Sequence, residues 1–270
     1  MSAAQTRDGT AILTVQHLTR NFGGLTAVSD VSLHLDRGEL VGLIGPNGAG
    51  KTTLFNLLTG VYPPSAGTIT FHRDGREMPL GGRRPYAICR AGVGRTFQNI
   101  RLFKDLSVLD NVRIARQQNH RYGLVGAFLH TPGYHRQEGT IREESLRLLE
   151  LMGLDSKAEE VARNLSYGEQ RHLEIARALA TDPTLLLLDE PAAGMNPNET
   201  AHLTGLIERL RKEFGLTILL IEHDMSLVMK ICERLYVLDH GQLIAAGNPA
   251  EVRGNRKVIE AYLGEEASDV

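Results

Sequence analysis

The sequence has 270 residues, of which 42% are hydrophobic and 23% charged, and this composition excludes wholesale disorder. A formal net charge of −2 excludes a strongly basic nucleic-acid binder and simple electrostatic adhesion to an anionic membrane. Cys89 and Cys232 lie far apart without a metal-binding spacing. No apolar run approaches the roughly 20 residues that a membrane span needs. We therefore expect a soluble, intracellular protein.

The first part of the chain predicts a short tail followed by strands. Residues 1–10 are polar and are expected to precede a single domain over residues 11–270. Residues 31–36 alternate apolar and polar side chains, which is typical of a strand with one solvent-facing side. Residues 39–44 are almost wholly apolar, as in a strand buried on both faces of a parallel sheet. A helix is expected at 53–58.

The middle of the chain, about residues 100–180, has a helical pattern and predicts an inserted helical subdomain. Thr140 and Glu143 have the spacing of a capping box at the start of one helix, and Gly153 suits its end. Ahead of this helix, residues 123–139 are rich in Gly, His and aromatic residues and are expected to form a loop or a short irregular helix.

The last third returns to alternating strands and helices, which predicts an α/β fold built on a parallel sheet. The expected elements are strands at 185–188 and 216–221, a helix at 197–214, a hairpin that turns at His240 and Gly241, and a helix at 256–263.

Residues 45–52 read Gly-Pro-Asn-Gly-Ala-Gly-Lys-Thr, the pattern of a phosphate-binding loop between a strand and a helix. Glycines let backbone N–H groups converge on phosphates, and the following helix adds the positive end of its dipole. Lys51 is expected to contact the β- and γ-phosphates, and the Thr52 hydroxyl to hold Mg²⁺. The expected nucleotide-binding residues are Gly45, Asn47, Gly48, Ala49, Gly50, Lys51, Thr52 and Thr53. A glycine-rich turn that merely links strand and helix is the plainer alternative.

Asp189 and Glu190 follow four leucines of a predicted buried strand. Ligands of open α/β sheets bind outside the carboxyl ends of the strands. We expect Asp189 to hold Mg²⁺ and Glu190 to orient or deprotonate the attacking water. Helix-capping or solvated loop acids are the alternative. Together with the phosphate-binding loop, the pair predicts magnesium-dependent hydrolysis of a nucleoside triphosphate.

Residues 165–171 read Leu-Ser-Tyr-Gly-Glu-Gln-Arg and precede a helix expected at 172–180. Ser166 and Glu169 fit a capping box, and such a helix start is also an anion site. The stretch resembles the signature motif of ABC-type ATPases, usually Leu-Ser-Gly-Gly-Gln, with Tyr167 in place of the first Gly and Glu169 in place of the Gln. The resemblance implies that Ser166, Gly168 and Glu169 contact ATP.

The resemblance extends over nearly the whole chain and implies a P-loop NTPase core with a mixed or parallel sheet. It also implies an N-terminal antiparallel β-subdomain and an inserted α-helical subdomain that carries the signature. Gln98 matches the Q-loop glutamine that touches Mg²⁺, His223 the switch histidine, and Phe22 the aromatic ring that stacks on adenine. Asn196 stands in the D-loop where Asp is common. Taken one at a time, each residue has a plainer interpretation. Gln98 could be a polar loop residue, His223 a histidine at the end of a strand, and Phe22 an aromatic residue of the core.

Because the chain has one phosphate-binding loop and one signature, the resemblance implies a head-to-tail dimer with a second ATPase subunit, identical or related. Residues 95–103, 190–197 and 261–264 resemble the ATPase subunits of bacterial branched-chain amino acid importers. That family implies two transmembrane permease subunits, a periplasmic solute-binding protein that acts indirectly, and a peripheral place on the inner face of the cell membrane. No nucleic-acid partner is expected.

Four alternatives stay open. A docking module whose ATPase has decayed is the least expected of them, because Lys51 and Glu190 are both present. Sister importers of urea or other amides carry similar motifs. A soluble ABC ATPase of translation or DNA repair would add a second ATPase half or a long coiled coil, which the sequence lacks. A nucleotide kinase would share the phosphate-binding loop but would need an Arg-rich lid, and it would not need Ser166 or His223.

Overall fold

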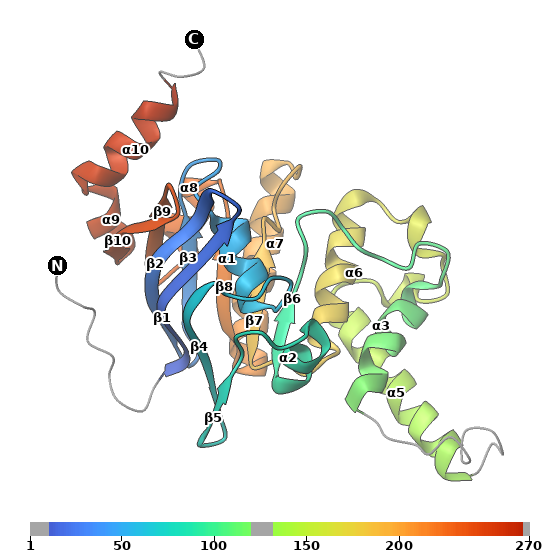
Figure 1. Ribbon diagram of the computed structural model, residues 1–270. Helices are drawn as coiled ribbons and strands as arrows, with labels where there is room; N and C mark the ends of the chain where they lie inside the picture. Colours follow the sequence, from blue (N-terminus) through green and yellow to red (C-terminus); the bar gives the residue numbers. More distant parts are fainter. Residues whose placement is uncertain (1–10, 120–131, 267–270) are drawn as a thin grey trace. The chain divides into compact units, whose positions relative to one another are not determined.

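The computed structural model describes residues 11–119 and 132–266, and the chain divides into two compact units (Figure 1). The sheet unit comprises Met1–Val93 and Thr184–Val270, and the helical unit comprises Gly94–Pro183. The tail expected at residues 1–10 lies outside the described residues. Among the residues that are described, no helix is both long and apolar enough to cross a membrane.

In the described part of the sheet unit, four strands form an antiparallel sheet in the order β2-β1-β4-β5. These strands are β1 (Ala11–Phe22), β2 (Leu25–Asp36), β4 (Ala66–Arg73) and β5 (Arg76–Pro79). The alternation expected at residues 31–36 is present, since Val31, Leu33 and Leu35 are buried. The expected solvent-facing side is only partly right. Ser32 is exposed, but His34 is buried because side chains of a neighbouring strand cover it.

Six strands among the described residues form the second sheet, in the order β10-β9-β3-β8-β7-β6. They are β3 (Leu40–Ile44), β6 (Val93–Arg95), β7 (Leu185–Asp189), β8 (Thr217–Ile221), β9 (Arg234–Asp239) and β10 (Gln242–Gly247). Strands β9, β3, β8 and β7 are parallel, and every residue of β3, β7 and β8 is buried. The carboxyl ends of these parallel strands therefore lie at one edge of the sheet, where a ligand is expected.

Helices of the sheet unit are α1 (Lys51–Leu58), α2 (Pro85–Ala91), α7 (Pro197–Phe214), α8 (Met225–Ile231), α9 (Pro249–Arg253) and α10 (Arg256–Glu266). Helix α1 begins two residues before the expected start, because Gly50 is its N-cap in a left-handed conformation. Helix α7 has the expected bounds, with Asn196 in a capping box and Pro197 at its first turn. The apolar core cluster draws on both sheets and on α1.

The helical unit contains α3 (Val108–Arg116), α5 (Pro132–Leu151), α6 (Tyr167–Leu179) and the short 3-10 helices η1 (Gln117–Asn119), η2 (Asp155–Lys157) and η3 (Ala162–Asn164). Helix α6 begins before the expected residue 172, because the Ser166–Glu169 capping box closes its first turn. Residue Gly153, with φ of +69°, follows α5 as expected.

The expected start of α5 at Thr140 is wrong. The Thr140 hydroxyl donates to the Arg136 carbonyl, so Thr140 lies inside the helix and does not cap it. An ion pair to α3 stabilises the added turns, because Arg113 lies 2.7 Å from Glu138. Residues 132–139 are therefore helical, and the rest of the expected loop, 123–131, lies outside the described residues.

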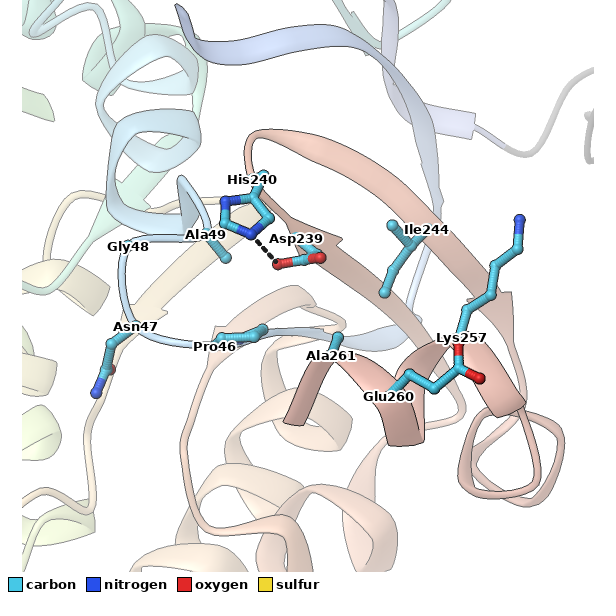
Figure 2. Close-up of a pocket in the computed structure, with 10 residues that line it drawn as sticks. All are labelled: Pro46, Asn47, Gly48, Ala49, Asp239, His240, Ile244, Lys257, Glu260 and Ala261. Carbon is cyan, nitrogen blue, oxygen red and sulfur yellow. Dashed lines mark ion pairs between the residues drawn. The ribbon is translucent and has the colours of Figure 1, made fainter. Parts of the chain in front are cut away.

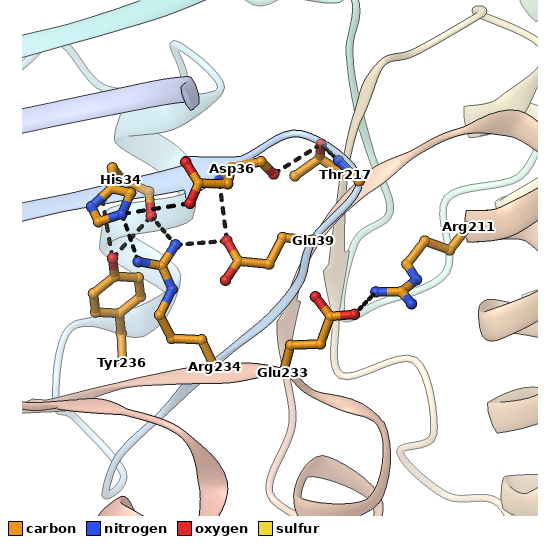
Figure 3. Close-up of polar contacts among 9 residues, drawn as sticks. His34, Asp36, Glu39, Arg211, Thr217, Glu233, Arg234 and Tyr236 are labelled. Carbon is orange, nitrogen blue, oxygen red and sulfur yellow. Dashed lines mark hydrogen bonds and ion pairs between the residues drawn. The ribbon is translucent and has the colours of Figure 1, made fainter. Parts of the chain in front are cut away.

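A polar cluster joins β2 and β9 to Glu39, the residue directly before β3 (Figure 3). The Tyr236 hydroxyl donates to the His34 carbonyl at 2.9 Å. Arg234 lies 2.7 Å from His34 Nε2 and donates to Glu39 at 2.6 Å. Because a guanidinium can only donate, His34 Nε2 accepts and the ring is neutral. Burial, and then the charge of Arg234, lower the pKa of His34 below its ordinary value, although the carboxylates of Asp36 and Glu39 oppose this.

We expect the free energy of unfolding to decrease as the pH falls below 6.5, the ordinary pKa of histidine. In that range His34 takes up a proton in the unfolded chain but not in the folded one, until the pH reaches its lowered folded pKa. His34→Gln keeps an acceptor for Arg234 and should flatten this dependence, as measured by urea unfolding at a series of pH values. The control His240→Gln, at an exposed histidine, should keep the wild-type slope, and an unchanged slope in His34→Gln would contradict the assignment.

Candidate functional site

The loop between β3 and α1 has a backbone that only glycine adopts easily. Its φ angles are +148° at Gly45, +75° at Gly48 and +100° at Gly50. A Cβ atom at Gly45 would collide with the Leu238 carbonyl, and one at Gly50 would lie 2.5 Å from the Ala27 carbonyl oxygen. Glycine is therefore required at both positions for its conformation and for space.

Contacts within the sheet unit hold this loop in shape. Lys51 is buried, and its ammonium donates to the carbonyls of Gly45 at 2.5 Å and Pro46 at 2.8 Å. The Ala49 carbonyl accepts from the N–H of Gly241, in the turn between β9 and β10, at 3.0 Å. Asn47, Gly48 and Thr52 are exposed, Ala49 is buried, and Thr53 is half-buried in the first turn of α1. The loop thus leaves exposed positions at a helix N-terminus, which is an anion-binding arrangement.

A pocket of about 720 Å³ lies between this loop, the β9–β10 turn and α10 (Figure 2). It is lined by Pro46, Asn47, Gly48, Ala49, Asp239, His240, Ile244, Lys257, Glu260 and Ala261. The pocket thus includes the loop residues Asn47, Gly48 and Ala49, whereas neither Lys51 nor Glu190 lines it.

The acidic pair lies at the same sheet edge as the phosphate-binding loop. In the strand register, Ile221 of β8 faces Leu43 of β3 on one side and Asp189 of β7 on the other. The Asp189 side chain is buried at this edge. Glu190 has a φ of +48°, a conformation that is strained for a residue with a side chain, and its N–H donates to the Ile221 carbonyl at 2.9 Å.

His223 is in direct contact with Glu190. Its Nε2 lies 2.8 Å from Glu190 Oε1, and the histidine side chain is 46% exposed, whereas that of Glu190 is 13% exposed. A carboxylate paired with a half-exposed imidazole is an arrangement suited to proton transfer.

Glu222, which the sequence analysis did not predict, is buried beside this pair. It accepts hydrogen bonds from the backbone N–H groups of Ala192 at 2.7 Å and His223 at 3.2 Å. Burial raises the pKa of the Glu222 carboxyl, and the nearby charge of Glu190 adds to the effect. The only sequence signal was an acidic residue directly after an apolar strand and next to His223.

Phe22 lies at the end of β1, and the residue is 37% exposed. Tyr62 contacts the ring edge to face at a centroid distance of 5.1 Å, and the Arg20 guanidinium lies 4.6 Å from its centroid. Two side chains therefore hold the ring in place while part of it stays open to solvent.

In the helical unit, the predicted signature residues form the start of α6. The Ser166 hydroxyl and N–H both donate to Glu169, whose N–H is capped by Ser166 in return. A hydrogen bond from Lys157 at 2.7 Å, followed by those from Ser166, lowers the pKa of Glu169. Ser166 is exposed and Gly168 is half-buried. The start of the helix therefore presents the Ser166 hydroxyl, and the charge of Glu169 beside it is balanced by Lys157.

The Gln98 turn is fixed to α6 through its backbone. The guanidinium of Arg171, which is fully buried, donates to the carbonyls of Phe97 at 2.7 Å and Gln98 at 2.9 Å. Glu174 pairs with Arg171 and accepts from the N–H groups of Phe97 and Arg101. The Gln98 residue itself is exposed. The sequence analysis did not predict this network.

Tyr167, which departs from the usual glycine of the signature, accepts a hydrogen bond from Arg171 at 3.3 Å. This contact gives the departure a structural reason, because the hydroxyl supplies one more acceptor for a buried guanidinium.

The structure thus places the predicted site residues other than Phe22 in two groups. The phosphate-binding loop, Asp189, Glu190 and His223 meet at one sheet edge, while Gln98 and the signature are joined in the helical unit. The Thr52 hydroxyl and the Asp189 carboxylate are hard oxygen donors of the kind that Mg²⁺ prefers. Within residues 11–119 and 132–266, no cluster of three His, Cys, Asp or Glu side chains could hold a metal ion alone.

Comparison with known proteins identifies the family. Residues 28–193 match the model of the ABC transporter family, and residues 242–268 match the model described as branched-chain amino acid ATP-binding cassette transporter.

The chain is 50% identical over 254 residues to the high-affinity branched-chain amino acid transport ATP-binding protein LivG of Salmonella typhimurium, covering 94% of this chain and 98% of the relative. It is 46% identical, with the same coverage, to the corresponding protein BraF of Pseudomonas aeruginosa.

Among solved structures, the ADP conformation of MJ1267, an ATP-binding cassette of an ABC transporter, matches with a TM-score of 0.78. Its sequence identity is 29%, and the match covers 94% of this chain and 99% of that structure. The expected P-loop NTPase fold is thereby confirmed. On the family model and on these identities, the chain belongs to the ATP-binding subunits of the ABC transporter family.

Proposed function

We propose that this chain binds and hydrolyses ATP to power an importer of branched-chain amino acids. The observation that carries the ATPase function is the meeting of the Lys51 loop, the Asp189–Glu190 pair and His223 at one sheet edge. The solute class is supported by the names of the LivG and BraF relatives and by the family model matched at residues 242–268.

At the site, the backbone of the phosphate-binding loop and Lys51 bind the β- and γ-phosphates. Thr52, Gln98 and Asp189 would hold Mg²⁺, whose charge counters that of the phosphate oxygens. Glu190 accepts a proton from the attacking water, and His223 supports it and contacts the γ-phosphate.

A second ATPase subunit completes each site in this proposal. Ser166, Gly168 and Glu169 of one subunit close over ATP bound to the other, head to tail, and supply a further layer of donors to the γ-phosphate. The helical unit is the inserted subdomain that carries this signature. Two permease subunits would bind the ATPase pair at the inner face of the membrane, and a periplasmic solute-binding protein would deliver the solute to them.

Phe22→Ala is expected to weaken ATP binding about tenfold while sparing the fold, since base–aromatic stacking contributes about 1–3 kcal/mol. Titration with a fluorescent ATP analogue measures this change. Phe214→Ala removes another partly exposed ring, at the end of α7, and should leave the affinity unchanged. Equal affinities of Phe22→Ala and the wild type would refute the stacking assignment.

Reconstitution tests the transport function. The chain is co-expressed with the membrane subunits that co-purify with it, and the complex is placed in liposomes with ATP on the side of the ATPase. ATP-dependent uptake of leucine, isoleucine or valine, lost in Lys51→Ala, would support the proposal. Uptake of urea instead would identify a sister importer, and full ATPase activity without any associated membrane subunit would point to a soluble ABC ATPase.

A further inference from the structure

Glu222 connects the two segments that carry Glu190 and His223. It follows β8 directly, and its side chain bridges two backbone N–H groups, one oxygen for each. One N–H belongs to Ala192, in the turn after Glu190, and the other belongs to His223. One carboxylate is therefore hydrogen-bonded to both backbone segments whose side chains, Glu190 and His223, meet at 2.8 Å.

Placing a carboxylate here costs free energy that an apolar residue would not. Glu222 is 4% exposed, and a carboxyl group in such a place loses its hydration. Glu222 follows the five residues of β8, all of which are buried. Packing of such a strand favours an apolar residue in the next buried position, so packing alone does not explain an acidic one. What offsets this cost is the pair of backbone segments that Glu222 holds in place. The Glu190 backbone has the strained φ of +48°, and such a conformation persists only where surrounding contacts maintain it.

We propose that Glu222 is a positioning residue for ATP hydrolysis, whose carboxylate ties the turn after Glu190 to His223 and thereby fixes the Glu190–His223 pair. This role rests on the proposed ATPase function. Glu222 acts through its neighbours and does not touch the nucleotide. Its loss should therefore reduce the rate of the chemical step and leave the binding of ATP unchanged.

The test compares steady-state ATP hydrolysis by full-length Glu222→Ala and Glu222→Gln with the wild type. Glu222→Ala should lower kcat about 10- to 100-fold, with KM for ATP within about twofold of the wild type, because a misplacement of about 1 Å can cost that much rate. Glu222→Gln keeps an oxygen for one of the two N–H groups and should restore part of the rate, to within about tenfold of the wild type.

Glu39→Ala is the matched control. Glu39 is another largely buried carboxylate of the sheet unit, and it accepts from Arg234 and from the Asp36 N–H just before β3 begins. That is the amino end of the parallel strands, opposite the site. Glu39→Ala should lower the melting temperature and leave kcat at the wild-type value at temperatures where the protein is folded.

A double-mutant comparison separates positioning from general stability. In a Glu190→Gln background, Glu222→Ala should cause little further loss of rate, because the side chain that it positions has already lost its function. The proposal would be overturned if Glu222→Ala lowered kcat by the same factor in both backgrounds. It would also be overturned by a wild-type kcat in folded Glu222→Ala, or by a raised KM for ATP. If Glu222→Ala does not fold, a three- to tenfold lower kcat in Glu222→Gln supports the role and a wild-type kcat refutes it. Absence of ATP hydrolysis by the wild type would instead refute the proposed function.

Discussion

Replacing Glu190 by Gln is expected to lower the rate of ATP hydrolysis about 10²- to 10⁴-fold, the usual contribution of a general base. The amide keeps the size of the side chain and an oxygen within reach of His223, which lies 2.8 Å away in the wild type. It cannot take the proton of the attacking water. ATP binding should be kept, because the phosphate-binding loop and Lys51 are unchanged, and unhydrolysed ATP should hold two subunits together.

Single-turnover hydrolysis measures the rate in this variant, and size-exclusion chromatography with ATP measures the dimer. Glu213→Gln alters an exposed carboxylate near the end of α7 and should match the wild type in both measurements. Wild-type turnover in Glu190→Gln would exclude this carboxylate as the catalytic base. Slow turnover without an ATP-dependent dimer would leave Glu190 as the base but contradict the head-to-tail arrangement.

Replacing Arg171 by Leu is expected to destabilise the helical unit by about 3–5 kcal/mol, the usual cost of removing one partner of a buried ion pair. Arg171 is fully buried, and Glu174, only 4% exposed, would lose its ion-pair partner and keep the hydrogen bonds from the Phe97 and Arg101 N–H groups. Burial already raises the pKa of Glu174, and the Arg171 charge opposes that rise. The substitution should therefore also raise this pKa further, so that the carboxyl takes up a proton more readily.

Urea unfolding followed by a probe attached to the helical unit measures the loss. The double variant Arg171→Leu, Glu174→Leu should recover part of the stability, since no charge is then buried without its partner. Arg142→Leu breaks an ion pair with Glu159 that is exposed at both ends, and it should cost no more than about 1 kcal/mol. If the two single variants, Arg171→Leu and Arg142→Leu, lost the same free energy of unfolding, the larger effect that we attribute to the buried pair would be contradicted.

The sequence predicted those parts of the fold and site that depend on near neighbours in the chain. The phosphate-binding loop, the Asp189–Glu190 pair after a buried strand and the α7 cap are patterns of a few residues, and the structure has each of them. The Ser166 capping box is equally local, although the helix that it starts is longer than expected. The individual roles of the site residues stay predictions until the variants are measured.

What the sequence did not predict depends on partners far away in the chain. His34 follows the alternation of a half-exposed strand, but Arg234 and Tyr236, about 200 residues later, cover it. Arg171 is likewise separated from Phe97 by 74 positions, and Glu222 from Ala192 by 30. No periodicity in the chain reveals such pairings, because they arise only when the strands and helices pack.

The Gln98 turn and the serine-bearing tip of α6 are held by the same buried guanidinium and carboxylate. We therefore expect a displacement of the Gln98 turn to move Ser166 as well, because Arg171 and Glu174 of α6 are hydrogen-bonded to that turn. The exposed Gln98 lies at one end of this connection and the Ser166 hydroxyl at the other, so a change in the position of the first should reach the second.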